Sequence, residues 1–237
     1  GSEITVSNLG VTTVTLSWPE AEDDAGITGY RIYKDGQLLA TVNGNVHSYS
    51  VIRLTKGTDY TFKVEAGDAD GNWTTDGPEV QITTHNYNNI ALGKPATASG
   101  QIADFSPSMA VDGISFDFNN VWADDPVNGN PCWLQIDLKD QYVIKMIEID
   151  DRHGDSWDWP RKAFEIRVSN DPEFNTYEVL GGIANDGTPM TDDATWVLSV
   201  NDKEGYRYVR YARTIGTNPL GHTYVTEFKV YGILKEE

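Results

Sequence analysis

Aromatic and charged residues alternate in one short stretch of the chain, between residues 152 and 161. The stretch reads R-H-G-D-S-W-D-W-P-R, and its glycine and proline predict a loop. Sugars are bound by aromatic rings that stack on their C–H faces and by polar side chains that hydrogen-bond to their hydroxyls. The loop therefore predicts a glycan-binding site. Its candidate ligand-binding residues are Arg152, His153, Asp155, Trp157, Trp159 and Arg161.

A second polar loop, residues 216–224, ends in two further residues of types suited to sugar binding. We expect its His222 and Tyr224 to reach the same site. An alternative interpretation gives this region no ligand. The two loop tryptophans then cover the end of a β-sandwich, and Arg152 pairs with neighbouring aspartates on the surface.

β-Strands must position these loops, because apolar and polar residues alternate with period two and no stretch keeps a helical period. The alternating runs of the second half are Leu134-Ile136-Leu138, Phe164-Ile166-Val168, Tyr206-Tyr208 and Phe228-Val230. They predict a β-sandwich of jelly-roll type over residues 86–237. Within it, we expect Cys132 to pack as a small, partly buried residue and Trp133 to fill the core.

Residues 1–85 show the same alternation, most clearly from Tyr60 to Ala66. Asp35-Gly36 lies between two further runs and predicts a hairpin, since this pair accepts the positive φ angles of a tight turn. The motif L-S-W and the run L-T-K-G-T-D-Y-T-F-K-V resemble a fibronectin type III domain, an immunoglobulin-like β-sandwich. The resemblance implies that Tyr60 is the tyrosine corner, whose hydroxyl bonds to upstream backbone. We expect this domain to act as a spacer.

Six ordered motifs run through the second half, from Asn89 to Gly232. They are N-I-A-L-G-K-P-A-T-A-S, A-V-D-G, W-L-Q-I-D-L, F-E-I-R-V-S-N-D, R-Y-V-R and E-F-K-V-Y-G. Their order and spacing resemble the discoidin family, or coagulation factor V/VIII C-type domain, whose bacterial members include the family 32 carbohydrate-binding modules. The resemblance implies an all-β chain, a fibronectin type III-like sandwich followed by a discoidin-like jelly roll that binds glycans. In family 32 modules an arginine, a histidine and aromatic residues on rim loops contact the sugar, and Arg152 lies at the arginine position.

The same resemblance implies a structural calcium ion, which is held by about six to eight oxygen ligands. In the family, the loop around A-V-D-G meets the chain end near E-F-K-V-Y-G to supply them. Asp112 and Glu227 match the positions of the side-chain ligands. The other implied ligands are the carbonyls of Met109, Ile114 and Thr226, and Asn120 at the position of a family threonine. The ion is expected to hold the binding rim in shape without touching the glycan.

An alternative for these residues needs no metal. Because Asp-Gly is a common turn pair, Asp112 is then a turn cap, and Glu227 is a solvated strand residue. An insertion at residues 115–117 lengthens this loop relative to the family pattern. We expect the segment carrying Phe116 and Phe118 to form another wall of the glycan site.

The chain is acidic, with a formal net charge of -18 over 237 residues. Both halves share the excess, because residues 1–86 hold 12 acids against 5 bases and residues 87–237 hold 24 against 13. Such a surface repels phosphate backbones and anionic headgroups, so we expect neither nucleic acid nor membrane insertion. No apolar run reaches the roughly 20 residues that span a bilayer. A neutral partner, a glycan or polysaccharide, fits better.

Catalysis is not expected. The acids of the second half permit a carboxylate pair for glycoside hydrolysis, but nothing in the sequence selects one. The patterns H-x-x-x-H, G-x-S-x-G and C-x-x-C are absent from it. The sequence therefore predicts an ancillary part of a carbohydrate-active enzyme.

Gly1 and Ser2 are expected to be a cloning remnant, so we expect a monomeric fragment of a larger, secreted or cell-surface protein. Two alternatives to glycan binding stay open. One is a spacer, protein-docking or adhesion module. The other is a membrane-binding discoidin domain, which the acidic composition disfavours.

Overall fold

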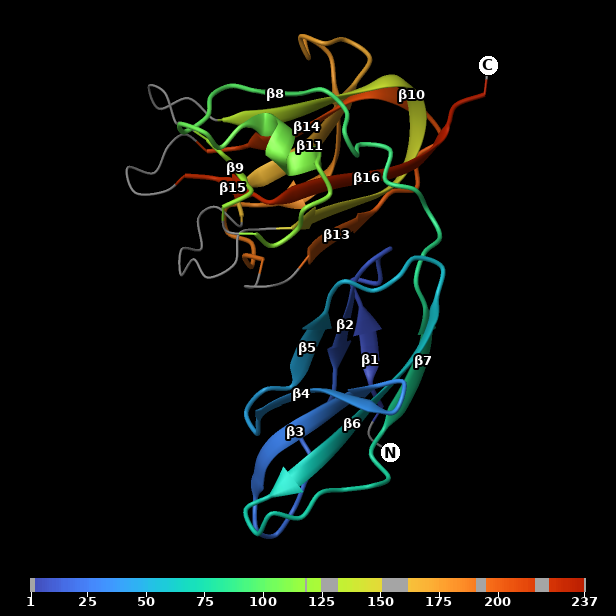
Figure 1. The fold of residues 1–237 in the computed structure, drawn as a ribbon, viewed down its shortest axis with the longest axis vertical. Helices are drawn as coiled ribbons and strands as arrows, with labels where there is room; N and C mark the ends of the chain where they lie inside the picture. The colour runs from blue at the N-terminus through green and yellow to red at the C-terminus, as the bar shows by residue number, and fades with distance from the viewer. Residues whose placement is uncertain are drawn as a thin grey trace. The chain divides into compact units, whose positions relative to one another are not determined.

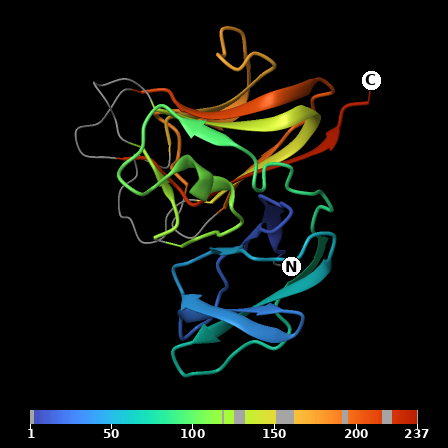
Figure 2. The ribbon, with the colours of Figure 1, turned by 45° about the horizontal axis from the view of Figure 1, so that its top comes forward.

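The computed structural model describes residues 3–117, 119–124, 132–150, 162–190, 195–215 and 222–236. The chain divides into two compact units, Gly1–Tyr87 and Asn88–Glu237. Each unit consists of antiparallel β-sheets around a hydrophobic core of its own (Figures 1 and 2). The prediction of an all-β fold is confirmed.

The first unit is a sandwich of a three-stranded sheet, ordered β1-β2-β5, and a four-stranded sheet, ordered β4-β3-β6-β7. Its strands are β1 (Thr5–Ser7), β2 (Val14–Ser17), β3 (Ile27–Lys34), β4 (Gln37–Asn43), β5 (Ser48–Val51), β6 (Asp59–Asp68) and β7 (Glu79–Thr83). Alternate residues of β2 and β6 point into the core, where Leu16 and Phe62 are fully buried. This is the alternation that the sequence predicts.

Two local predictions in this unit are confirmed. The turn between β3 and β4 consists of Asp35 and Gly36, with φ angles of 51° and 77°, as a two-residue hairpin turn requires. The backbone N–H of Thr55 donates a hydrogen bond to the hydroxyl of Tyr60 over 2.9 Å. Tyr60 is therefore the tyrosine corner.

Among its described residues, the second unit has a seven-stranded sheet, a two-stranded sheet formed by β9 and β15, and one short 3-10 helix. Its elements are β8 (Ala96–Ala98), η1 (Pro107–Val111), β9 (Trp122–Ala123), β10 (Trp133–Asp150), β11 (Phe164–Ser169), β12 (Glu178–Ile183), β13 (Thr195–Ser199), β14 (Gly205–Arg213), β15 (Tyr224–Val225) and β16 (Glu227–Leu234). In the described part of the chain, no helix is long and apolar enough to cross a membrane.

Strand β10 runs through both layers of the second unit, because the seven-stranded sheet bends around the core along this strand (Figure 1). Its first half pairs with β14 and β8, and its second half pairs with β16 and β13. The pairing register with β14 shifts between Asp137 and Tyr142, where Lys139 has a positive φ of 76°. Figure 1 shows the strand curving sharply between the two halves. One strand of 18 residues thus contributes to both sides of the core.

The residues around the start of β10 test two predictions. Cys132 is 4% exposed, so its predicted packing role is confirmed. The prediction that Trp133 fills the core is wrong, because Leu134 and Ile136 point inward and the alternation of the strand places Trp133 on the opposite face. There the guanidinium of Arg210 lies 4.3 Å from the Trp133 ring centroid, a cation–π contact.

Candidate functional site

Tyr224 is the first residue of β15, which pairs with β9 in the two-stranded sheet of the second unit, and His222 precedes it by two positions. Their ring centroids are 6.3 Å apart in an edge-to-face arrangement, and 43% of the His222 side chain is exposed. The structure thus brings these two predicted ligand-binding residues together. The other six lie outside the described residues: Arg152, His153, Asp155, Trp157, Trp159 and Arg161.

A buried aspartate anchors this pair to β9. The Asp124 carboxylate accepts a hydrogen bond from the Thr223 amide, and the Asp124 amide donates to the Thr223 carbonyl over 3.0 Å. The Nδ1 atom of His222 lies 2.9 Å from the Asp124 carbonyl oxygen. Asp124 itself is fully buried. The backbone of Thr223 and one ring nitrogen of His222 therefore fix this segment to Asp124, directly after β9.

The surroundings of Asp124 are charged but not reactive. An Arg213 nitrogen, Nη1, lies 4.0 Å from Asp124 Oδ2, and both side chains are buried. The thiol of Cys132 lies 3.6 Å from the Thr223 hydroxyl. Burial, together with the negative charge of Asp124, raises the pKa of Cys132 well above its ordinary value. A neutral, buried thiol is neither a nucleophile nor a metal ligand, so the cluster acts as a support.

The predicted calcium loop folds against the start of β16. The Gly113 amide donates to Glu227 Oε2 over 3.1 Å. The carboxylate of Asp112 accepts hydrogen bonds from the Ile114 amide at 2.9 Å and from Asn120 Nδ2 at 3.1 and 3.0 Å. Asp112, Asn120 and Glu227 are therefore gathered around one loop, as the family resemblance implies.

The two other implied ligands with described contacts lie at the edges of this loop. The hydroxyl of Thr226 accepts a hydrogen bond from the Phe116 amide over 3.2 Å and donates to the Asp150 carbonyl over 3.0 Å. Met109 lies in η1, where its amide donates to the Ser106 carbonyl over 3.1 Å. The backbone amide of the inserted residue Phe116 thus connects this loop to Thr226, directly before β16.

Burial separates the two interpretations of Glu227. The residue is only 1% exposed, so the alternative of a solvated strand residue is wrong for it. Desolvation raises the pKa of Glu227 to about 7, and its Oε1 atom has no hydrogen-bond partner among the described residues. A buried carboxylate oxygen without a donor is suited to a cation. The Asp112 interpretation as a turn cap holds in part, because Asp112 accepts from Ile114 as a cap does.

Side chains alone do not complete a metal shell here. Within the described ranges, no three His, Cys, Asp or Glu side chains gather closely enough to hold an ion. A calcium ion at Asp112 and Glu227 would depend on backbone carbonyls as well, which calcium sites commonly use. The residues present fit such a mixed oxygen site.

The family model for the F5/8 type C domain matches residues 95–228, a range that contains both the His222–Tyr224 pair and the loop of Asp112. The chain belongs to the F5/8 type C domain family. The family model for the fibronectin type III domain matches residues 2–83. The family resemblances of both halves are therefore confirmed.

Curated relatives are matched over small parts of their own lengths. Chitinase 63 of Streptomyces plicatus is 41% identical over 80 residues, which are 34% of this chain and 13% of that protein. Chitinase C of Streptomyces lividans is 32% identical over 173 residues, which are 67% of this chain and 27% of that protein. Among solved structures, the lectin domain of lectinolysin in complex with Lewis B antigen has 18% identity and a TM-score of 0.50, and the match covers 61% of this chain and 96% of that domain. This likeness shows the fold alone.

The F5/8 type C domain also contains a buried ionic network that the motifs did not predict. Lys229 Nζ lies 2.5 Å from Asp150 Oδ2 and 3.7 Å from Glu148 Oε2. The hydroxyls of Thr195 and Tyr231 donate to these two carboxylates at 2.6 and 2.8 Å. The network joins β10, β13 and β16, which are far apart in the sequence.

This network lies next to Glu227, which contacts the predicted calcium loop of the F5/8 type C domain. Glu148, Asp150 and Glu227 are three buried acids in neighbouring registers of β10 and β16, and Lys229 is a nearby buried base. One ammonium balances at most one of these charges if all three acids ionise. The available sequence signal was a charged residue inside an apolar strand, such as Glu148 between two isoleucines.

Proposed function

We propose that the F5/8 type C domain is a non-catalytic glycan-binding module and that the fibronectin type III domain is its spacer, within a secreted carbohydrate-active protein. The observation that carries the proposal is the His222–Tyr224 pair, a partly exposed imidazole beside an aromatic ring on a segment that Asp124 fixes. An imidazole hydrogen-bonds to sugar hydroxyls and an aromatic ring stacks on a sugar face. The two chitinase relatives support a carbohydrate-active parent protein.

The tryptophan-rich segment of residues 152–161 completes the site in this proposal. It follows β10 directly in the sequence and carries Trp157 and Trp159. A single shallow site of this composition is expected to bind one sugar only weakly, with a dissociation constant on the order of high micromolar to millimolar. Useful retention on a polymer then comes from several modules acting together.

A structural calcium ion is the second part of the proposal. Asp112 and Glu227 would hold it with nearby carbonyls, and the ion would neutralise the carboxylates that meet where the loop contacts β16. Two observations support it. Glu227 Oε1 is buried without a hydrogen-bond partner among the described residues, and Gly113 holds the other Glu227 oxygen against the loop. The ion supplies charge and rigidity, and the glycan is bound by the rim residues.

Glycan-array binding of a multimerised form of the chain tests the function, in calcium and in chelator. We expect binding that is lost in Trp157→Ala, Trp159→Ala and His222→Ala. If the unmodified chain binds glycan in calcium and loses this binding in chelator, the ion supports binding. No binding to host, plant or microbial glycans would contradict the proposal and favour a spacer or protein-docking module.

A further inference from the structure

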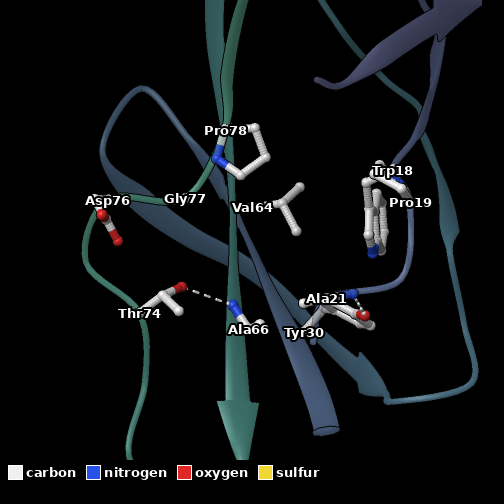
Figure 3. A pocket seen from close by; sticks show the side chains of 10 residues that line it. All are labelled: Trp18, Pro19, Ala21, Tyr30, Val64, Ala66, Thr74, Asp76, Gly77 and Pro78. Atoms are coloured by element: carbon white, nitrogen blue, oxygen red, sulfur yellow. Dashed lines mark hydrogen bonds between the residues drawn. The ribbon is translucent and has the colours of Figure 1, made fainter. Parts of the chain in front are cut away.

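A crevice opens in the fibronectin type III domain, between the loop that follows β2 and the segment before β7. Its volume is about 300 Å³. Figure 3 shows Trp18 and Pro19 on one side, Gly77 and Pro78 on the other, and Val64 and Ala66 of β6 between them. The walls are mostly apolar, so the crevice offers a buried surface to an apolar group.

Hydrogen bonds to the sandwich hold both walls in place. On one side, the Ala21 amide donates to the Tyr30 hydroxyl over 3.0 Å. On the other, the Ala66 amide donates to the Thr74 hydroxyl over 2.9 Å, and the Val64 amide donates to the Pro78 carbonyl over 3.0 Å. Figure 3 shows the first two of these bonds at the crevice. The opening is therefore a built feature of the domain.

The crevice contains an unused hydrogen-bond donor. Trp18 is 5% exposed, and its Nε1 atom has no hydrogen-bond partner among the residues that the structure describes. In Figure 3 this nitrogen points along the crevice toward Ala21 and Tyr30. A buried N–H without an acceptor costs free energy. A ligand that places a carbonyl oxygen here would recover it.

The entrance to the crevice is acidic. Glu20, Glu22, Asp23 and Asp24 follow Trp18-Pro19 directly, all are exposed, and Asp76 lies on the opposite wall. Two basic residues of neighbouring strands are already engaged. Lys63 Nζ donates to Glu65 and to the Thr75 carbonyl at 2.8 and 2.6 Å, and the Arg31 guanidinium lies 3.8 Å from the Trp73 ring centroid. The entrance therefore favours a positively charged ligand.

We propose that this crevice is a docking site for an extended, basic polypeptide segment. The apolar stem of a lysine or arginine, or a flanking proline, fills the space beside Val64 and Ala66, and the charged head faces Asp76 and the acidic loop. A backbone carbonyl of the segment accepts the hydrogen bond from Trp18. A sugar fits less well, because Trp18 and Tyr30 are 5% and 2% exposed and offer no open ring face for stacking.

Titration of the whole chain, labelled with ¹⁵N, against two acetylated and amidated hexapeptides tests the proposal by NMR. One peptide alternates proline with lysine, and the other alternates proline with glutamate. We expect the lysine peptide to shift the Trp18 indole N–H and the Val64 and Ala66 amides in a saturable manner. We expect the glutamate peptide, and a chitin hexasaccharide, to leave these signals unchanged.

Variants locate the effect on the crevice. Asp76→Lys is on the surface and should weaken binding of the lysine peptide about fivefold at low salt, since it replaces an attraction by a repulsion. Asp59→Lys changes an exposed acid of the same domain at the far end of β6 and should weaken it less than about twofold. Ala66→Leu fills the crevice and should abolish the Trp18 shift. Absent shifts, equal shifts with both peptides, or equal effects of the two lysine variants would overturn the proposal.

Discussion

The backbone amide of Gly113 donates a hydrogen bond to the carboxylate of Glu227 over 3.1 Å, although 114 positions separate the two residues. The contact closes the loop after η1 onto the start of β16. It satisfies one carboxylate oxygen and leaves the other, Oε1, buried without a hydrogen-bond partner among the described residues. The F5/8 type C domain therefore places a buried acidic oxygen at a fixed position, where a bound cation would compensate its lost hydration.

Calcium should stabilise this domain through Glu227. A ligand that binds the folded state alone adds about 2.7 kcal/mol to the free energy of unfolding when its concentration is 100 times its dissociation constant. We expect calcium to raise the unfolding temperature of the F5/8 type C domain by several degrees in scanning calorimetry, and Glu227→Gln or Asp112→Asn to remove this rise. Asp186→Asn, at an exposed acid, is the matched control and should keep it. An unchanged unfolding temperature in calcium and in chelator would contradict a calcium site.

The tyrosine corner should contribute measurably to the stability of the fibronectin type III domain. Tyr60→Phe removes the hydroxyl that accepts the Thr55 amide, and a lost hydrogen bond of this kind costs about 1 kcal/mol. Tyr49→Phe is the control, because Tyr49 is a half-buried tyrosine of β5 in the same domain. Urea unfolding should show the larger loss of free energy for Tyr60→Phe, and equal losses would argue that the corner bond adds nothing.

An ion pair on the F5/8 type C domain should make the free energy of unfolding of this domain depend on pH. Arg207 donates to both Asp137 oxygens at 2.8 and 2.9 Å, and these bonds hold the pKa of Asp137 well below its usual range. The unfolded chain titrates this group near pH 4. The contribution is therefore fully present above about pH 5 and is lost as the pH falls toward the lower folded pKa.

Asp137→Asn isolates this contribution. At pH 7 we expect the variant to lose roughly 1 kcal/mol of unfolding free energy, and the difference from the parent should shrink steadily between about pH 5 and pH 2. Urea unfolding at several pH values measures it. A difference that stays constant with pH would show that the effect is one of shape and not of charge.

Asp124 should be required for an ordered rim. Asp124→Ala removes the acceptor of the Thr223 amide and exposes that amide to solvent, which we expect to accelerate its hydrogen exchange about tenfold or more. Glycan binding should fall as well, because His222 loses its fixed backbone. Asp104→Ala changes an exposed acid of the same domain and should alter neither. Normal exchange at Thr223 in the Asp124 variant would remove Asp124 from this role.

Period-two alternation was enough to predict much of the fold. Leu134 and Ile136 are buried because alternate residues of a strand share a face, and Asp35-Gly36 forms a hairpin because its two residues adopt positive φ. The error at Trp133 has the same origin. Trp133 belongs to the same strand as Leu134 and Ile136, and the alternation that buries those two residues places Trp133 on the opposite face.

The candidate site was less predictable, because its contacts join distant strands. The family motif indicated Asp112 and Glu227, and their local sequences do not reveal that Glu227 is buried or that Gly113 faces it. The role of Asp124 as a buried anchor was not predicted either, since its partner Thr223 lies 99 positions away. Such pairings depend on how β9 and β15 meet, which alternation within one strand does not determine.

Cys132 is the single cysteine of the chain, and it is buried against Thr223 with a thiol that resists ionisation. A thiol-directed reagent therefore reaches it only when the start of β10 separates from its neighbours. The rate at which such a reagent labels Cys132 therefore reports how often the F5/8 type C domain opens. A cysteine introduced on the surface can be labelled or immobilised selectively, because the native cysteine does not react in the folded domain.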